Sequence, residues 1–413
     1  MTETPSSGCE LQCLWLTREY PYPANAGDLI YSRFLAESFA EAGADLTVLC
    51  RDTPDGVDSP KTPPPSIAWK RVSGKLRKAV FSLLSSLPSL PHRYATRRFR
   101  SALEKLLRDR KWQVVLIDHL GMGWVLEVLN KVLPSGPRQP PVVFVSHNHE
   151  ETARLRMAKH YRGNFLKRAA LFWDAKKAGR LERVLVESAD LVTVNTLEDR
   201  ALFARSHPEK RYLVLTPGYL RRVVTSRVIT QNDPRRAVVL GSFDWLAKQI
   251  DLREFLKVAD PMFAAAGAAL GVIGRAPEPF LADIRDGLQA TSFTGAVEDI
   301  SQHLDGARIG IVPERTGHGF KHKVLDYVFN RIPVAAVENS VTGMPLVPGE
   351  SLLVYPDMAA LCRGVLAVLD DVERLNQLQQ SAFEKCLGQF DWQSRGRDLF
   401  DHVKALVALR STV

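Results

Sequence analysis

The stretch IGIVPERTGHGFKHKVLDYVFNRIPVAAV, residues 309–337, decides the fold of this chain. Its first residues, Ile309–Val312, form an apolar run that predicts a buried strand, and a turn with two glycines follows. Residues 321–329 then fit a helix, and residues 333–337 predict a second buried strand. This order is a βαβ unit. The turn therefore lies at the carboxyl end of a parallel strand, where open α/β sheets bind ligands.

The start of this predicted helix has the features of a phosphate site. The backbone N–H groups of residues 318–321, the helix dipole and the charges of Lys321 and Lys323 together suit a diphosphate. Asp326, further along the helix, supplies a carboxylate that can accept hydrogen bonds from ribose hydroxyls. The alternative is an ordinary surface turn with solvated lysines, and this stretch alone favours neither interpretation.

The length of the chain predicts more than one domain. It has 413 residues, which suits two domains of about 200 residues each. Because 45% of the residues are hydrophobic and 24% are charged, each half can bury a core. The sequence has no run of 18 apolar residues that could span a membrane. The first ten residues lack the basic and apolar regions of a signal peptide, so a cytoplasmic protein is expected.

The net charge of +9 favours an anionic partner, which could be a nucleotide, a membrane surface or a nucleic acid. The basic segments Arg93–Lys111 and Arg154–Lys177 predict attraction to an anionic membrane surface, with the protein peripheral at its inner face. The alternative is a solvated helix that packs its leucines on the domain. The sequence has no nucleic-acid module pattern, so no nucleic-acid partner is expected.

The first half of the chain alternates between predicted strands and helices. A loop at residues 18–28 follows the first strand, and a helix is predicted at residues 29–42. Residues 52–66 are expected to form a loop, and a long basic helical region is expected at residues 151–187. The predicted strands are residues 11–16, 46–50, 114–117, 142–145, 191–194 and 213–216.

The second half repeats this architecture without repeating the sequence. A polar, arginine-rich stretch ends the first half, and a last helix is predicted at residues 395–409. The predicted strands are residues 238–240, 270–273, 292–294, 309–312, 334–337 and 352–354. Two α/β halves of this kind predict two doubly wound, Rossmann-like parallel-sheet domains.

An ordered set of short motifs extends from about Leu11 to Asp391. Its members are Tyr22-Pro23-x-x-Ala26-Gly27-Asp28, Ser146-His147-Asn148-x-Glu150, Ala189-Asp190 with Asn195-Thr196 and Asp199, Gly241-Ser-Phe-Asp-Trp245, Gly295-Ala-Val-Glu-Asp-Ile-Ser, Ala307-Arg-Ile-Gly-Ile-Val-Pro, Gly317-x-Gly-x-Lys-x-Lys-Val-Leu-Asp and Ile332-Pro-Val. The set resembles the family 4 retaining glycosyltransferases, and within them the bacterial polysaccharide branch. The resemblance implies a GT-B architecture, in which two Rossmann-like domains face each other across a cleft.

The resemblance also assigns roles along the chain. The sequence itself predicts a disordered tail at residues 1–10 and a linker at 218–236. With the resemblance, the remaining parts are an acceptor domain at 11–217, a nucleotide-sugar domain at 237–390 and a C-terminal helix at 391–413 that packs back on the first domain. The residues implied as catalytic are His147, His318 and Lys321. Those implied to bind the donor are Gly27, Lys248, Arg275, Gly317, Gly319, Phe320, Lys323 and Asp326. Those implied on the acceptor side are Asp28, Asp118, His119 and Glu150.

The chain departs from the family at three positions. The family carries two carboxylates eight positions apart around the glycine turn, and here His318 takes the first place while Asp326 takes the second. Ser242 stands where an arginine is common, and Lys248 is one position away from the usual lysine. We expect Lys321 and Lys323 to supply the missing positive charge.

The expected activity is retaining transfer of a hexosyl group from a nucleoside diphosphate sugar to a hydroxyl of a glycan or lipid-linked acceptor, in cell-surface polysaccharide or glycoconjugate synthesis. No cofactor is expected beside the donor, which is expected to be a UDP-sugar. No metal is expected, because the sequence lacks the Asp-x-Asp pair of metal-dependent enzymes. Two alternatives remain open. One is a non-hydrolysing sugar-nucleotide epimerase, which shares the fold, and the other is a non-catalytic GT-B partner subunit, which His318 favours.

Overall fold

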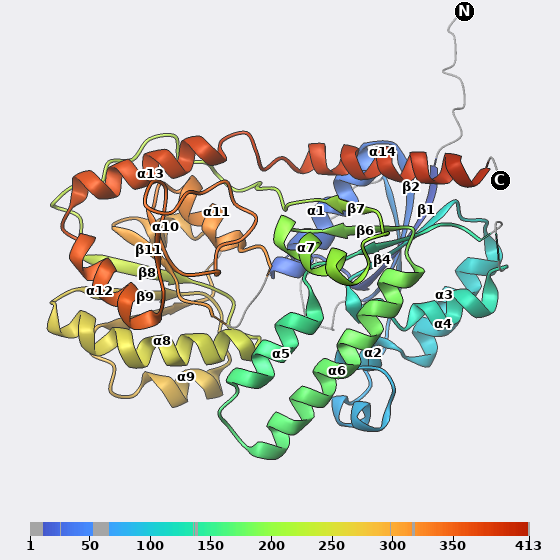
Figure 1. Cartoon of the computed structure of the whole chain (residues 1–413), viewed down its shortest axis with the longest axis horizontal. Helices are drawn as coiled ribbons and strands as arrows, with labels where there is room; N and C mark the ends of the chain where they lie inside the picture. The colour runs from blue at the N-terminus through green and yellow to red at the C-terminus, as the bar shows by residue number, and fades with distance from the viewer. Residues whose placement is uncertain are drawn as a thin grey trace, which may run out of the picture. The chain divides into compact units, whose positions relative to one another are not determined.

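The computed structural model describes residues 11–24, 26–52, 66–134, 136, 139–297, 299–315 and 319–411. The chain divides into two compact units. Unit 1 comprises Met1–Ala158, Gly163–Gly218 and Asp391–Val413, and unit 2 comprises Lys159–Arg162 and Tyr219–Phe390. Each unit contains one fully parallel sheet with helices on both of its faces (Figure 1). The predicted fold class, with two doubly wound Rossmann-like domains, is confirmed.

The sheet of unit 1 has seven strands in the order β3-β2-β1-β4-β5-β6-β7. Their bounds are β1 (Leu11–Glu19), β2 (Ala44–Arg51), β3 (Ile67–Val72), β4 (Val114–Asp118), β5 (Val142–Val145), β6 (Leu191–Val194) and β7 (Tyr212–Val214). Alternate residues of β1 enter different cores, with Leu14 and Leu16 on one face and Cys13 and Trp15 on the other. The central run of the strand, Cys13–Leu16, is apolar because both faces of the sheet are buried there.

The helices that accompany this sheet are α1 (Gly27–Glu41), the 3₁₀ helix η1 (Ala79–Leu84), α2 (Ser89–Tyr94), α3 (Arg97–Asp109), the 3₁₀ helix η2 (Leu120–Met122), α4 (Val125–Val132), α5 (Glu150–His160), α6 (Phe165–Ser188), α7 (Leu197–Ser206) and α14 (Trp392–Ser411). The last helix, α14, packs on α1. Gly396 allows this approach, since a Cβ there would lie 2.3 Å from the main-chain carbon of Ser38. Trp392 and Leu399 thus enter the same core as Phe39.

The segment before β4 contains one strand that the sequence did not indicate. This is β3, at the edge of the sheet, and the helices η1, α2 and α3 follow it. The long basic helical region predicted at residues 151–187 is two helices, α5 and α6. The pattern of β3, Ile-Ala-Trp-Lys-Arg-Val, buries only its first residue, so the apolar signal of a central strand is absent.

The sheet of unit 2 has six strands in the order β10-β9-β8-β11-β12-β13. Their bounds are β8 (Arg236–Leu240), β9 (Ala269–Ile273), β10 (Thr291–Gly295), β11 (Ile309–Val312), β12 (Val334–Val337) and β13 (Leu353–Tyr355). The helices are α8 (Leu246–Ala265), α9 (Glu278–Arg285), α10 (Ser301–Leu304), α11 (His322–Phe329), α12 (Met358–Val368) and α13 (Val372–Cys386). The βαβ unit predicted from residues 309–337 is β11–α11–β12, with β11 at the predicted bounds and β12 starting at Val334, one residue after the start predicted from this stretch.

The expected linker residues make several contacts within unit 2. The backbone N–H of Val224 donates to the oxygen of Phe329 at 2.8 Å, and that of Ile229 donates to the side chain of Asn376 at 2.9 Å. Ile229 is also buried in a core of this unit. The stretch therefore forms part of unit 2 rather than a free connection.

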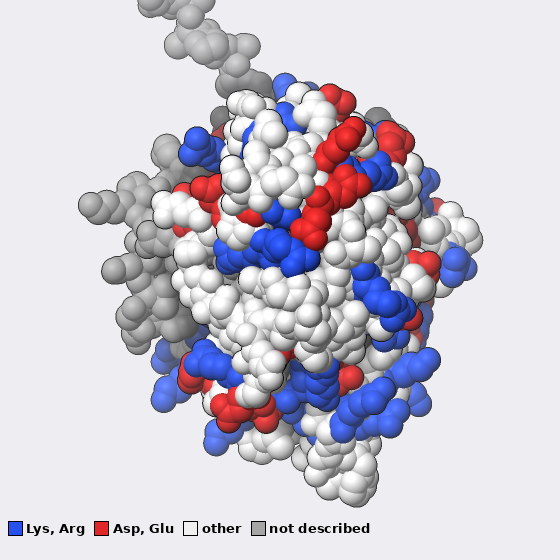
Figure 2. Space-filling view, turned by 90° about the vertical axis from the view of Figure 1, so that its left-hand side faces the viewer, with Lys and Arg blue, Asp and Glu red and all other residues white. Residues whose placement is uncertain are grey.

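On the face that Figure 2 shows, most of the surface is uncharged, and lysine and arginine side chains lie in scattered groups, several of them beside aspartate and glutamate. Four cysteines of the described chain are free and buried, namely Cys13, Cys50, Cys362 and Cys386. Among the described helices, none combines the length and apolar character that crossing a membrane requires.

Candidate functional site

The strand order of the unit 2 sheet reverses between β8 and β11, which lie side by side at its centre. In open α/β sheets, ligands bind outside the carboxyl ends of the strands at such a point. The loop after β8 and the residues after β11 form this point in unit 2. The N-terminus of α11 follows in the same βαβ unit.

Glu314, which follows β11, is a buried carboxylate with only 4% of its surface exposed. Lys323 in the first turn of α11 pairs with its Oε1 and donates to the main-chain oxygen of Leu240 at 2.9 Å. Oε2 has no hydrogen-bond partner among the described residues. Burial opposes the ionisation of Glu314, but the nearby lysines, Lys323 foremost, hold its pKa below the ordinary value. The carboxylate thus fixes the position of Lys323.

Lys248 in the first turn of α8 and Lys321 at the N-cap of α11 lie near the same carboxylate. We call Lys248, Lys321 and Lys323 the lysine cluster, since all three interact electrostatically with Glu314. The pKa of Lys321 is lowered to about 8, chiefly by burial and also by the charges of the other two lysines. Three ammonium groups and a helix N-terminus beside two carboxylates, Glu314 and Asp251, still leave an excess of positive charge, which suits a phosphate or diphosphate.

The loop after β8 approaches the end of β9 very closely. A Cβ on Gly274, whose φ is +131°, would lie 1.7 Å from the main-chain oxygen of Gly241. Arg275 follows Gly274 and donates to Asp244 Oδ2 from Nε at 2.9 Å and from Nη2 at 2.6 Å. The sequence predicts that Arg275 binds the donor. In the structure its side chain is exposed and pairs with Asp244 in the loop after β8.

Asp326 lies on α11 and is 9% exposed. Arg221 donates from Nη1 to its Oδ1 at 3.2 Å. Burial raises the pKa of Asp326 to about 6, although Arg221 opposes the rise. The carboxylate is thus mostly ionised at neutral pH and already has one cationic partner. Its contact with a ribose stays a prediction.

The glycine turn before α11 is described only in part. Gly317 and His318 lie outside the described residues, so the roles expected of them are still predictions. Gly319 adopts a φ of +84°, a left-handed conformation that favours glycine. Phe320 packs edge-on against His322, with ring centroids 5.5 Å apart.

In unit 1 the strand order reverses between β1 and β4, and charged residues gather at the carboxyl ends of these strands. Arg18 at the end of β1 pairs with Asp28 in the first turn of α1, which begins at Gly27. Gly121 leaves room for Arg18, because a Cβ there would lie 2.2 Å from the arginine Cδ. Burial opposes the ionisation of Asp28, but Arg18 holds its pKa below the ordinary value.

Asp118 ends β4 and is fully buried. Its Oδ1 lies 2.6 Å from His147 Nε2, and its Oδ2 accepts a hydrogen bond from Trp15 Nε1 at 3.1 Å.

Burial opposes the ionisation of Asp118, but His147 holds the pKa of Asp118 below its ordinary value. An ionised carboxylate can only accept, so Nε2 carries a proton. Asp118 therefore sets the orientation of the His147 ring. The rings of His147 and Tyr31 pack in a T-shaped arrangement with their centroids 4.9 Å apart.

His119 directly follows Asp118 in a left-handed conformation, with a φ of +73°. Its Nδ1 accepts from the backbone N–H of Gly121 at 2.8 Å, and its Nε2 lies 3.7 Å from Glu150 Oε1. Burial, followed by the charges of nearby cations, lowers the pKa of His119 well below its ordinary value, so the ring is neutral. Glu150 in turn accepts from Arg154 Nε at 2.8 Å. The predicted acceptor-side residues Asp28, Asp118, His119 and Glu150 thus lie close together as one group, within electrostatic reach of His119.

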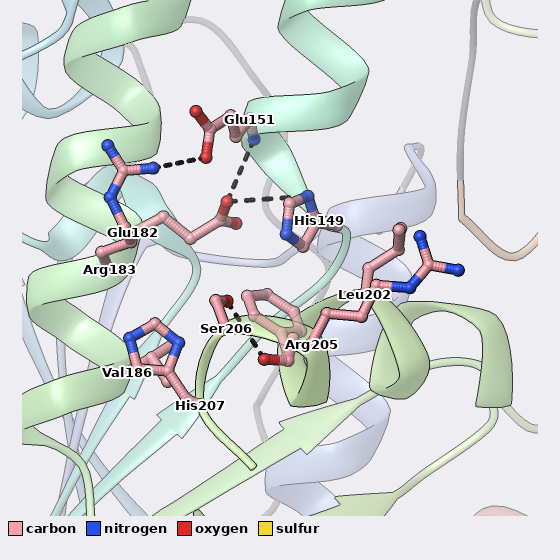
Figure 3. Close-up of a pocket in the computed structure, with 10 residues that line it drawn as sticks. His149, Glu151, Glu182, Arg183, Val186, Leu202, Arg205, Ser206 and His207 are labelled. Carbon is pink, nitrogen blue, oxygen red and sulfur yellow. Dashed lines mark hydrogen bonds and ion pairs between the residues drawn. The ribbon is translucent and has the colours of Figure 1, made fainter.

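Beside this group, at the start of α5, lies a cavity of about 240 Å³ (Figure 3). Glu182 of α6 reaches into it and accepts from the backbone N–H groups of Glu150 at 2.7 Å and Glu151 at 3.0 Å. These bonds cap α5 from outside its own sequence. Burial raises the pKa of Glu182 to about 8. The lining residues are His149, Glu151, Glu182, Arg183, Val186, Leu202, Phe203, Arg205, Ser206 and His207.

Four residues that contact the predicted site residues in the two units were not predicted from the sequence, namely Arg221, Glu182, Glu314 and Tyr327. Tyr327 is buried on α11, and its hydroxyl accepts from the backbone N–H of Leu240 at 2.7 Å. Of the four, only Glu314 had a local signal, because it stands two residues after a buried strand at the ligand end of the sheet. In the described parts of the chain, no three His, Cys, Asp or Glu side chains are grouped so that they could hold a metal ion.

Two protein-family models match the chain. The model described as Glycosyl transferases group 1 matches residues 234–371, and the model described as Glycosyl transferase 4-like domain matches residues 30–218. No curated protein sequence gives a match. The first match covers the lysine cluster, and the second covers most of unit 1.

Solved structures similar to this chain share its two-domain fold. Sucrose-phosphate synthase (tll1590) from Thermosynechococcus elongatus is 17% identical with a TM-score of 0.71, over 96% of this chain and all of the other. Anabaena Alr3699/HepE in complex with UDP and glucose is 11% identical with a TM-score of 0.64, over 96% and 100%. WaaG, a glycosyltransferase involved in lipopolysaccharide biosynthesis, is 13% identical with a TM-score of 0.65, over 95% and 99%. At these identities the likeness concerns the fold.

Proposed function

Because the chain is a GT-B glycosyltransferase of the family 4-like type, we propose that it transfers a hexosyl group from a nucleoside diphosphate sugar to a hydroxyl group with retention of configuration. The acceptor is a glycan or a lipid-linked glycan, and the product belongs to a cell-surface polysaccharide or glycoconjugate. The protein acts in the cytoplasm, at the inner face of the membrane. It needs no metal and no cofactor beside the donor.

The lysine cluster is the observation that carries this proposal. Departure of a nucleoside diphosphate leaves negative charge on the phosphate oxygens, and preorganised cations are the groups that stabilise such charge. Lys323 is held in place by Glu314 and the main-chain oxygen of Leu240, so its side chain loses little conformational entropy when the donor binds. Lys321, with a pKa of about 8, is protonated at neutral pH, and a bound diphosphate would raise its pKa further.

In unit 1 we assign His147 to hydrogen bonding with the sugar or the acceptor hydroxyl. Its ring is oriented by Asp118, which is a positioning residue in this assignment. The neutral His119 and the paired Asp28 lie in the same group, and Gly27 at the start of α1 allows a close approach of the backbone. No residue of this group is assigned as a nucleophile.

A UDP-sugar is the proposed donor. The Anabaena protein of similar fold was solved with UDP and glucose, which supports trying uridine nucleotides first. The involvement of WaaG in lipopolysaccharide biosynthesis supports a glycan acceptor attached to lipid. Asp326 is the proposed ribose contact, with Lys321 and Lys323 on the diphosphate.

The test begins with thermal shift of the full chain against a panel of nucleoside diphosphates and their sugars, since a ligand that binds the native state raises the melting temperature. Turnover is then followed by NMR, which separates a new glycosidic bond from an epimerised nucleotide and reports the anomeric configuration of the product. Lys321→Ala should lower kcat by roughly 10²-fold, as loss of an oxyanion-type donor does.

Lys257→Ala is the matched control, because this lysine also belongs to unit 2 but is exposed on α8, where it pairs with Glu254. It should leave the rate unchanged. Wild-type rates for Lys321→Ala at saturating donor would contradict the assignment of the lysine cluster. An absence of any new glycosidic bond with every donor would contradict the proposed transfer.

A further inference from the structure

Two segments of unit 1 expose large apolar side chains. In η1, Leu84 is 94% exposed and Phe81 is 57% exposed, and in the first half of α6, Phe165 is 76% exposed. We call the exposed apolar residues of the two segments the apolar patch. Its members are Val80, Phe81, Leu83, Leu84, Phe165, Leu166 and Trp173.

The short helix η1 exposes its apolar residues and buries a polar one, which is the reverse of an ordinary surface helix. Its one buried residue is Ser82, while its leucines and its phenylalanine face outward. The helix is fixed through its main chain, because the buried Lys177 donates to the oxygen of Ser82 at 2.6 Å and to that of Ser85 at 3.3 Å. An anchored backbone with outward apolar side chains needs a partner, since such contiguous patches mark interaction sites.

The two segments lie next to each other. Lys177 belongs to α6, and the backbone N–H of Ser89, just after η1, donates to Asp174 of the same helix at 2.6 Å. Trp173 is the residue before Asp174, and Leu166 lies seven residues earlier, which places both on one side of the helix. Figure 1 shows the coil of η1 beside α6. Trp173 therefore lies beside η1, and Leu166 continues the apolar surface along the same side of α6.

The exposed charges of the two segments are basic, and Asp174, the carboxylate next to Trp173, is paired with Arg154. Residues 75–91 and 163–173 contain no aspartate or glutamate. The exposed basic residues of the two stretches are Lys75, Arg77, Lys78, Lys167 and Arg168. Basic residues beside outward aromatic and leucine side chains are the arrangement that binds at the interface of an anionic lipid membrane.

The basic segments indicated by the sequence contribute only in part, because the patch takes residues 165–173 from Arg154–Lys177 and none from Arg93–Lys111. The apolar side of α3 is buried in the core of unit 1 through Phe99, Leu103 and Leu107, so it is not available to lipid. The Arg154 side chain is only 13% exposed and pairs with Glu150 and Asp174. The surface suited to lipid is thus η1 with the start of α6.

We propose that the apolar patch and its basic border dock unit 1 on an anionic lipid surface. The apolar side chains enter the boundary between headgroups and acyl chains, while the lysines and arginines contact the lipid phosphates. A second copy of this chain is the less suitable occupant, because pairing two such patches would bring like charges together. The inference rests on the proposed location at a membrane and not on the donor chemistry, which concerns the lysine cluster of unit 2.

Flotation with lipid vesicles tests this surface in the full chain without any donor. Wild type should float with vesicles of three parts phosphatidylcholine and one part phosphatidylglycerol at low salt, and should bind poorly to phosphatidylcholine alone. The double variant Phe81→Ser/Leu84→Ser should lower the apparent affinity at least about tenfold, since binding scales with the buried apolar area. The variant Lys75→Gln/Lys78→Gln should weaken binding most at low salt, where electrostatic attraction is least screened.

The control Val228→Ser/Leu387→Ser removes two similarly exposed apolar side chains from unit 2 and should float as wild type does. Equal melting temperatures would show that all variants are folded. The proposal is overturned if wild type does not float at low salt or if Phe81→Ser/Leu84→Ser floats equally well. It is also overturned if light scattering finds a wild-type dimer that this variant abolishes. Flotation without any transfer activity would instead contradict the proposed function and leave this surface supported.

Discussion

Replacing Lys323 by methionine should destabilise unit 2 through the carboxylate that it leaves behind. In the native protein, Lys323 pairs with Oε1 of Glu314, and both side chains are at least 90% buried. Methionine keeps most of the side-chain volume but removes the charge. Glu314 would then remain in the interior without its main cation, while its Oε2 already has no hydrogen-bond partner among the described residues.

The size of the loss follows from this environment. Breaking a buried ion pair by removing one partner costs about 3–5 kcal/mol. Because Lys248 and Lys321 still act on Glu314 in the variant, we expect the lower limit, about 3 kcal/mol. For a unit of this size, 1 kcal/mol shifts Tm by about 2–4 °C, so Lys323→Met should lower the Tm of unit 2 by about 6–12 °C.

The loss should depend on pH. The lysines hold the pKa of Glu314 below its ordinary value, so its pairing stabilises the wild type above that value and is lost as pH falls through the lowered pKa. In Lys323→Met the pKa of Glu314 rises, and the cost of its ionisation grows as pH increases above the ordinary value. The difference in Tm between variant and wild type should therefore be larger at pH 7.5 than at pH 5.

Differential scanning calorimetry at both pH values measures these shifts. The double variant Lys323→Met/Glu314→Gln removes the stranded charge and should recover most of the lost Tm. As a control, Lys385→Met breaks the exposed pair with Glu350 and should cost less than about 1 kcal/mol. A pH-independent loss, or a double variant as unstable as the single one, would refute the reasoning about Glu314.

Three further predictions concern the other charged groups. Asp118→Asn should lower kcat by roughly 10–100-fold and shift the pH profile of the reaction, with little change in the KM for the donor. The reason is that the variant disturbs the orientation of His147 and not the binding of the donor. An unchanged pH profile would argue for a merely structural role. Asp326→Ala should weaken nucleotide binding by about 1–3 kcal/mol in calorimetry. Wild-type affinity should also fall as pH drops through about 6, where Asp326 protonates, and a pH-independent affinity would remove it from the ribose site. The pKa of Glu182 is raised to about 8, so its ionisation destabilises the fold increasingly as pH rises from its ordinary value to about 8. The Tm of Glu182→Gln relative to wild type should therefore increase between pH 5 and pH 8, and a constant difference would show that Glu182 does not titrate there.

The amino-acid sequence by itself determined the strands that are buried on both faces. The bounds predicted among the strands are correct for β5, β6, β11 and β12. A central parallel strand is a continuous apolar run, and such a run can be recognised from the sequence alone. The same local patterns placed the glycine turn and the two lysines of α11 at the ligand end of a strand. The edge strand β3 was missed because it buries too little apolar surface to produce such a run.

Only the tertiary structure decided which charges are paired and which apolar residues stay outside. Asp118 meets His147 across 29 residues, Arg221 meets Asp326 across 105, and Glu182 caps a helix that begins 32 residues earlier. These partners come together because crossover connections return the chain to the same edge of a sheet, an event that no local period records. The leucines of α3 turned inward and those of η1 turned outward for the same reason, since burial depends on which face of an element the rest of the fold covers.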